Sequence, residues 1–133
     1  MKFLLDADTC VFWLRGRESV HDHMANVGPQ ETAISVVTLA ELRYGAACSA
    51  YPEANNRAID DFISEITVVG IESEIARAFG TIKAYLRRQG MLIEDLDLLV
   101  AATALTLGMT LITNNTDHFS RVPGLLLDNW LDK

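Results

Sequence analysis

Three acidic residues of this sequence stand where a charge is out of place. Asp6 ends a short apolar run, Glu41 lies in a mostly apolar helical segment, and Asp97 lies inside the apolar stretch LDLLVAATALTL. An aspartate is almost never fully buried without a partner. Two carboxylates about 4 Å apart repel each other by about 4 kcal/mol at an effective dielectric constant near 20. If these acids converge, a cation is the simplest means of keeping them ionised.

Oxygen ligands without nitrogen or sulfur favour a hard cation such as Mg²⁺ or Mn²⁺. A zinc site is not expected, because Cys10 and Cys48 have no metal-like spacing. His21 and His23 are two residues apart, do not face one site on a helix, and are interpreted as surface residues. A divalent ion held by carboxylates suits phosphodiester hydrolysis, because it lowers the pKa of water and stabilises the leaving oxygen.

The elements that must position these residues alternate between short apolar runs and longer helical segments. This alternation predicts an α/β fold, a three-layer α/β/α domain with a central, mainly parallel sheet of four to five strands, in a single domain spanning residues 1–133. The expected strands are Lys2–Leu5, Thr32–Ser35, Thr67–Val69, Thr110–Thr113 and, as a fifth candidate, Leu125–Leu127. The expected helices are Ala7–Arg15, Val20–Val27, Thr38–Cys48, a helix from Pro52 to Ile66, Glu74–Gln89 capped by Ser73, and Asp95–Leu107.

Ligands of such sheets bind beyond the carboxyl ends of the strands. Asp6 ends the first strand and Asp8 follows it, Glu41 lies one turn into the helix after the second strand, and Asp97 lies in the first turn of its helix. The end of the fourth strand is followed by more polar residues, namely Asn114, Asn115 and Asp117. In a parallel sheet, all of these side chains can converge on one edge.

Each acid also has a structural explanation. Asp6 could be a helix N-cap, Asp97 could be favoured by the helix dipole, and Glu41 could be a solvated helix residue. Asp8, Asn115 and Asp117 could be turn or cap residues. Jointly these explanations are weaker, because acids from four separate segments would then share one end of the sheet by chance.

The overall charge argues against a nucleic-acid ligand. The chain has 133 residues, of which 50% are hydrophobic, and a formal net charge of −7. Phosphate binding usually shows as a basic face. The conflict is reduced if the acids hold cations and if basic residues line the rim of the site: Arg15, Arg17, Lys83, Arg87 and Arg88.

A cytoplasmic protein is expected, because the two cysteines are interpreted as reduced thiols and the N-terminus does not resemble a signal peptide. The apolar stretch from Leu96 to Thr113 is interpreted as a buried helix, a turn and a strand rather than a membrane span.

Four motifs carry a resemblance to a known family. The segments FLLDADTCV, ISVVTLAELRYG, DLDLLVAATAL and LITNNTDHFSRVPGLLLDNW, in this order and spacing, resemble the PIN-domain ribonucleases, and among them the VapC toxins of bacterial toxin–antitoxin pairs. The resemblance covers nearly the whole chain, from about Lys2 to Trp130.

The resemblance implies a PIN-like domain whose metal ligands and catalytic residues are Asp6, Glu41 and Asp97. Here the segment of the family's fourth acid reads Thr113, Asn114, Asn115, Thr116 and Asp117, so either Asn115 or Asp117 is expected to complete the metal site. The resemblance makes Asp8 an accessory residue, and we give the same place to Thr113.

The resemblance further implies a Mg²⁺- or Mn²⁺-dependent endoribonuclease that cleaves structured RNA, with tRNA as the first candidate, and thereby inhibits translation and growth. It also implies a homodimer that a small VapB-like antitoxin neutralises, and contact with DNA only through that antitoxin.

Three alternatives stay open at this point. A phosphatase of the haloacid-dehalogenase type would use Asp6 of the sequence Asp6-Ala7-Asp8-Thr9 as its nucleophile. A non-catalytic domain would bind a partner or RNA without cutting it. A related nuclease would act in RNA maturation rather than as a toxin.

Overall fold

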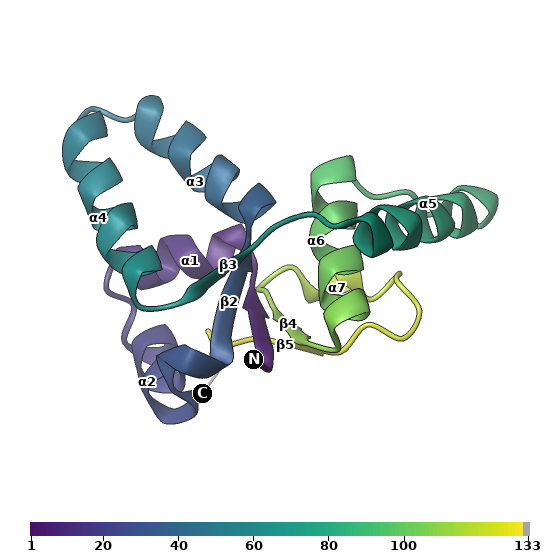
Figure 1. Cartoon of the computed structure of the whole chain (residues 1–133), viewed down its shortest axis with the longest axis horizontal. Coiled ribbons are helices and arrows are strands. Elements are labelled where there is room, and N and C mark those ends of the chain that lie inside the picture. Colours follow the sequence, from purple (N-terminus) through teal and green to yellow (C-terminus); the bar gives the residue numbers. More distant parts are fainter. Residues whose placement is uncertain (132–133) are drawn as a thin grey trace.

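The protein forms a five-stranded sheet with helices on both faces (Figure 1). The computed structural model describes residues 1–131, so the last two residues of the predicted domain lie outside it. The strands are β1 (Phe3–Leu5), β2 (Thr32–Ser35), β3 (Thr67–Val69), β4 (Thr110–Ile112) and β5 (Leu127–Asp128). The helices are α1 (Ala7–Leu14), α2 (Glu18–Val27), the 3₁₀ turn η1 (Pro29–Glu31), α3 (Val36–Ala47), α4 (Pro52–Ser64), α5 (Ser73–Arg88), α6 (Asp95–Leu107) and α7 (Thr116–Phe119).

Neighbouring residues of the strands face opposite layers, as the pleat requires. Leu4 and Leu111 pack in a core with α5 and α6, whereas Leu5 and Ile112 pack in a second core with α1, α2 and α4. Figure 1 shows the two helical layers on opposite sides of the sheet. The expected three-layer α/β/α architecture is therefore confirmed.

The sheet contains a switch point between β1 and β4. All strand pairs are parallel and the order is β3-β2-β1-β4-β5. Strands β2 and β3 therefore lie on one side of β1 in the sheet, and β4 and β5 lie on its other side. In open α/β sheets, ligands bind at such a point, beyond the carboxyl ends of the strands. Asp6 follows β1 there and Thr113 follows β4.

Several predicted boundaries are wrong for local reasons. Helix α3 begins at Val36 rather than Thr38, because the Ser35 hydroxyl accepts a hydrogen bond from the Val37 amide at 3.0 Å and caps the helix. Ser73 is the first residue of α5 rather than its cap. Strand β5 lies at Leu127–Asp128, two residues later than expected, and α7 was not expected.

The apolar stretch from Leu96 to Thr113 has the expected arrangement. Helix α6 ends at Gly108, which has a positive φ of 67°, and β4 follows. A left-handed residue at a helix end is favourable for glycine because it has no Cβ. Among residues 1–131, no helix is long and apolar enough to cross a membrane.

The two histidines of α2 are not the surface residues that the sequence suggested. The His21 ring stacks on Trp13 at 4.4 Å between centroids, and its Nε2 lies 2.7 Å from the Trp13 carbonyl oxygen. The His23 ring stacks on Trp130 at 5.5 Å. Both are half-buried, because α2 packs against α1 and against the segment that follows β5. They serve packing and lie away from the predicted site.

Candidate functional site

Asp6 is a buried carboxylate at the end of β1. Its side chain is only 6% exposed, and it caps α1 by accepting a hydrogen bond from the Ala7 amide at 2.8 Å. Burial, followed by the charge of Asp8, raises the pKa of Asp6 to about 7, although the hydrogen bonds from Ala7 and Thr113 lower it. The cap explains the position of Asp6 but not its burial beside a second acid.

Thr113 connects the two strands at the switch point. Its hydroxyl donates to Asp6 Oδ2 at 2.9 Å, and Asp8 Oδ2, at 3.4 Å, is the alternative acceptor. The same hydroxyl accepts from the Asn115 amide at 3.0 Å, and the Asn114 amide donates to Asp8 Oδ2 at 3.0 Å. Asp6 and Asp8 are thus held in place by the loop that follows β4.

Glu41 and Asp97 bring two further carboxyl groups to this edge. Burial raises the pKa of Glu41, and the charges of Asp97 and Glu94 raise it further. Burial also raises the pKa of Asp97, His118 lowers it, and Glu94 and Asp8 raise it. One carboxylate oxygen of Glu41, Oε1, is buried without a hydrogen-bond partner. A buried acceptor in this state calls for an unseen donor or cation.

These side chains form one acidic cluster, defined here as Asp6, Asp8, Glu41, Glu94 and Asp97. The two other candidates are placed differently. The Asn115 side chain is exposed, and its Nδ2 lies 2.9 Å from His118 Nδ1. Asp117 is exposed on α7 and is not among the charges that raise the pKa of Asp6, Glu41 or Asp97.

Two residues near the site were missed from the sequence. Glu94 is the N-cap residue of α6 and His118 lies on α7, and each is close enough to change the pKa of Asp97. Glu94 precedes Asp97 by three residues and therefore lies at the same end of the helix. His118 gave no signal, because α7 has only four residues and shows no periodicity.

The donors fit a hard divalent cation in their chemistry. The cluster contains only carboxylate oxygens, one of them is an orphaned buried oxygen of Glu41, and the acids raise one another's pKa. Within residues 1–131, however, no three Asp, Glu, His or Cys side chains are already close enough together to hold an ion. Binding would therefore require the side chains to move inward.

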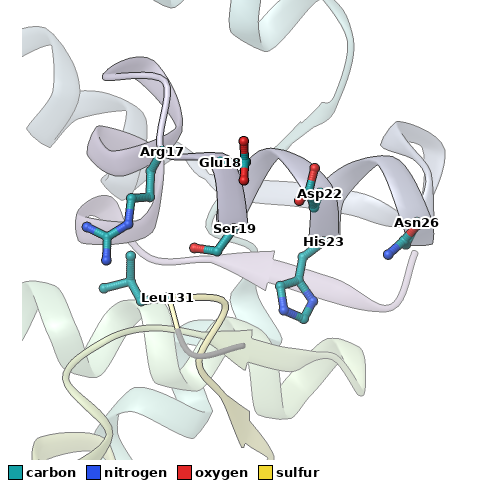
Figure 2. A pocket seen from close by; sticks show the side chains of 7 residues that line it. All are labelled: Arg17, Glu18, Ser19, Asp22, His23, Asn26 and Leu131. Atoms are coloured by element: carbon teal, nitrogen blue, oxygen red, sulfur yellow. The ribbon is translucent and has the colours of Figure 1, made fainter.

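Two hollows have different relations to this cluster. One of about 360 Å³ runs between α1, α3 and α4, is mostly apolar, and has Glu41 in its lining. Another of about 380 Å³ lies between α2 and Leu131 (Figure 2) and has none of the predicted site residues in its lining. Only the first hollow, called the apolar groove below, is connected to the candidate site.

Comparisons with known proteins agree with this architecture. The PIN domain family matches residues 3–125. The ribonuclease VapC2 of Haemophilus influenzae is 37% identical over 131 residues, covering 98% of this chain and 99% of the relative. The tRNA(fMet)-specific endonuclease VapC of Shigella flexneri is 37% identical over 130 residues, covering 98% of each chain. In the crystal structure of DNA-bound VapBC from Salmonella typhimurium, a chain of 34% identity superposes with a TM-score of 0.93, covering 98% of each chain.

This chain therefore belongs to the PIN-domain family, in its VapC branch. Family and fold class are both as the sequence predicted.

Proposed function

We propose that this protein is a metal-dependent endoribonuclease, a single nuclease domain that cleaves structured RNA in the cytoplasm and so inhibits translation and growth. The observation that supports this proposal best is that buried or half-buried carboxyl groups from the end of β1, from α3 and from α6 meet at the switch point of the sheet. A tRNA is the first candidate substrate, because a relative of 37% identity is named as a tRNA(fMet)-specific endonuclease.

Asp6, Glu41 and Asp97 are the proposed holders of Mg²⁺ or Mn²⁺. When bound, such an ion lowers the pKa of water and stabilises the leaving oxygen of the phosphodiester. The Thr113 hydroxyl orients the Asp6 carboxylate, and the amide of Asn114 orients Asp8. Of the two candidates for a fourth metal ligand, Asn115 is favoured over Asp117. Its backbone amide donates a hydrogen bond to the Thr113 hydroxyl, which itself contacts Asp6.

The experiment that tests this activity compares the protein with its Asp97→Asn variant. Incubated with bulk tRNA and Mg²⁺, the wild type is expected to give discrete fragments, and Asp97→Asn is expected to lose at least about 100-fold in rate. Expression of the wild type is expected to arrest growth, and the variant is expected to be tolerated. Mapping the 5′ ends of the fragments identifies the RNA. Full activity in a folded Asp97→Asn protein would remove the basis of the assignment.

The apolar groove supports a second part of the proposal, a VapB-like antitoxin partner. A structural neighbour of 34% identity is part of a VapBC complex. The groove is lined by apolar side chains such as Val11, Leu14 and Ile59, and Glu41 is among its lining residues. An amphipathic helix would cover the apolar part, and an arginine next to it would pair with the acidic cluster. DNA contact would then belong to the antitoxin.

A charge placed in the groove should block this partner. Ala58 is exposed on α4 and lines the groove, whereas Ala54, one turn earlier on the same helix, does not line it. The antitoxin candidate is the product of a small reading frame next to the gene. Ala58→Glu is expected not to co-purify with this product, whereas Ala54→Glu is expected to co-purify with it. RNA cleavage by both variants should equal that of the wild type. Equal retention of the partner by both variants would place it elsewhere.

A homodimer is also proposed. Large apolar side chains are exposed at Val36 after β2, at Ile71 after β3, and at Leu96 in the first turn of α6. All three come from the end of the sheet that bears the acidic cluster. A second copy that covered them would place two acidic clusters near each other. Light scattering of the purified protein gives the mass, and a monomer at micromolar concentration would contradict this part.

The phosphatase alternative loses support because it gives no role to Glu41, whose carboxyl group lies with Asp97 and Glu94 in the acidic cluster. The non-catalytic alternative predicts no binding of Mn²⁺ in calorimetry. A role in RNA maturation predicts cleavage without growth arrest.

A further inference from the structure

Helix α5 is basic, although the chain as a whole is acidic. The whole sequence has 18 acidic and 11 basic residues, whereas α5 has one acidic residue, Glu74, and four basic ones: Arg77, Lys83, Arg87 and Arg88. Arg77, Arg87 and Arg88 are exposed, and in the described part of the chain none of them lies within 4 Å of a carboxylate. Unpaired arginines on an otherwise acidic protein leave a cationic surface available for an anion.

The basic side chains surround a shallow hollow. Lys83, Arg87 and Arg88 line it together with Gly80 and Ala84, and its volume is about 370 Å³. Lys83 and Arg87 are one helical turn apart, about 6 Å along the axis, as are Ala84 and Arg88, so the two pairs form adjacent rows on one face. Because Gly80 and Ala84 are small, the floor of the hollow lies low between the cationic side chains.

An ion pair links the hollow to the first turn of α6, the helix that carries Asp97. Lys83 Nζ lies 2.8 Å from Asp95 Oδ1, and Asp95 is followed two residues later by Asp97. Next to the same helix start, the Arg121 guanidinium donates to the Leu92 carbonyl at 3.2 Å. Helices α5 and α6 share one core, and in Figure 1 α5 runs across the direction of α6 and points away from it. A polymer that reaches the acidic cluster can therefore continue over α5.

We propose that the hollow lined by Lys83, Arg87 and Arg88 binds the phosphate backbone of the RNA on one side of the cleaved bond. This inference rests on the proposed nuclease function and deepens it, because it names the surface that holds the substrate. Arginine suits the task, since its planar guanidinium pairs with phosphate through two parallel hydrogen bonds. The arrangement also explains how a chain of charge −7 attracts a polyanion, since the basic residues are concentrated where the RNA lies.

The test is Arg87→Gln/Arg88→Gln against the control Lys2→Gln/Arg57→Gln. Both pairs remove two exposed positive charges, and Lys2 and Arg57 lie before β1 and on α4, away from α5. Binding of fluorescently labelled bulk tRNA is measured by anisotropy in EDTA at low salt. The α5 variant is expected to bind about tenfold more weakly than the wild type, and the control within about twofold. The slope of log affinity against log salt concentration should fall by about 1.4 to 1.8 in the α5 variant, since each of the two lost phosphate contacts contributes about 0.7 on a single strand and about 0.9 on a duplex.

Equal affinity of the two double variants would overturn the inference, as would a wild type that fails to bind tRNA. A change of oligomeric mass in the α5 variant alone, measured by light scattering, would assign the hollow to a contact between subunits and also overturn it. Cleavage of bulk tRNA in Mg²⁺ at saturating protein separates this result from the activity itself. All three proteins should then reach the same maximal rate, because neither pair of substitutions touches the acidic cluster. Failure of the nuclease proposal would instead appear as absence of cleavage by the wild type and the control alike.

Discussion

Asp6→Asn is expected to abolish RNA cleavage and at the same time to stabilise the metal-free protein at pH 8. Asparagine keeps an oxygen for the Ala7 amide and a polar group for Thr113, so the cap of α1 survives. It removes a charge that is 6% exposed and beside Asp8. Because a stabilising substitution cannot lose activity through unfolding, the two effects together identify a functional charge.

The size of the gain follows from the pKa of Asp6, which rises from 3.8 to about 7 on folding. A shift of about three units corresponds to about 4 kcal/mol. A raised pKa means that the folded state binds the proton more tightly, so this contribution is fully present below about pH 4 and is lost as the pH rises through about 7. The difference between variant and wild type should therefore be near zero at pH 4 and on the order of 2–4 kcal/mol at pH 8.

Urea denaturation at a series of pH values in EDTA measures this difference. Asp61→Asn is the matched control, because Asp61 is exposed on α4 and outside the acidic cluster. Its effect is expected to be small and independent of pH. A destabilised Asp6→Asn protein at pH 8 would show that Asp6 acts as a structural cap rather than as a strained functional carboxylate.

Removal of divalent metal is expected to stop cleavage completely, and Mg²⁺ or Mn²⁺ to restore it. The same ions should stabilise the fold, because they compensate the repulsion within the acidic cluster and satisfy Glu41 Oε1. An ion at 100 times its dissociation constant adds about 2.7 kcal/mol to the free energy of unfolding. For a chain of this size, that raises Tm by on the order of 5–10 °C.

Differential scanning fluorimetry with Mn²⁺, using Asp97→Asn as the comparison, measures this linkage. The wild type should show the full rise in Tm and the variant a small part of it. An opposite charge also favours ionised carboxylates, so Mn²⁺ should flatten the loss of stability between pH 4 and 7. Cleavage that persists in excess EDTA would exclude the metal-dependent account.

The family, the layers of the fold and the segments that meet at the site could be predicted from the sequence. Strand ends can be predicted because an apolar run stops at a polar residue, as at Asp6 after β1 and at Ser35, the last residue of β2. The alternation of strand and helix makes the sheet parallel, and a parallel sheet gathers such residues at one edge. These inferences need only the order of the elements along the chain.

What the sequence could not supply depends on distances in space. The Thr113 hydroxyl reaches Asp6 across 107 positions in the chain, and no periodicity encodes that contact. The placement of His118 near Asp97 depends on the four-residue helix α7, which is too short to give a pattern. Asp117 has the expected chemistry but is exposed, whereas His118, the next residue on α7, is half-buried near Asp97, since successive residues of a helix face different directions.

The proposed metal site is tested most directly by soaking crystals of the protein in Mn²⁺ and locating the ion by anomalous diffraction. We predict one or more manganese peaks within bonding distance of carboxylate oxygens from Asp6, Glu41 and Asp97. Manganese bound only elsewhere on the surface, with these three carboxylates apart and free of metal, would contradict it.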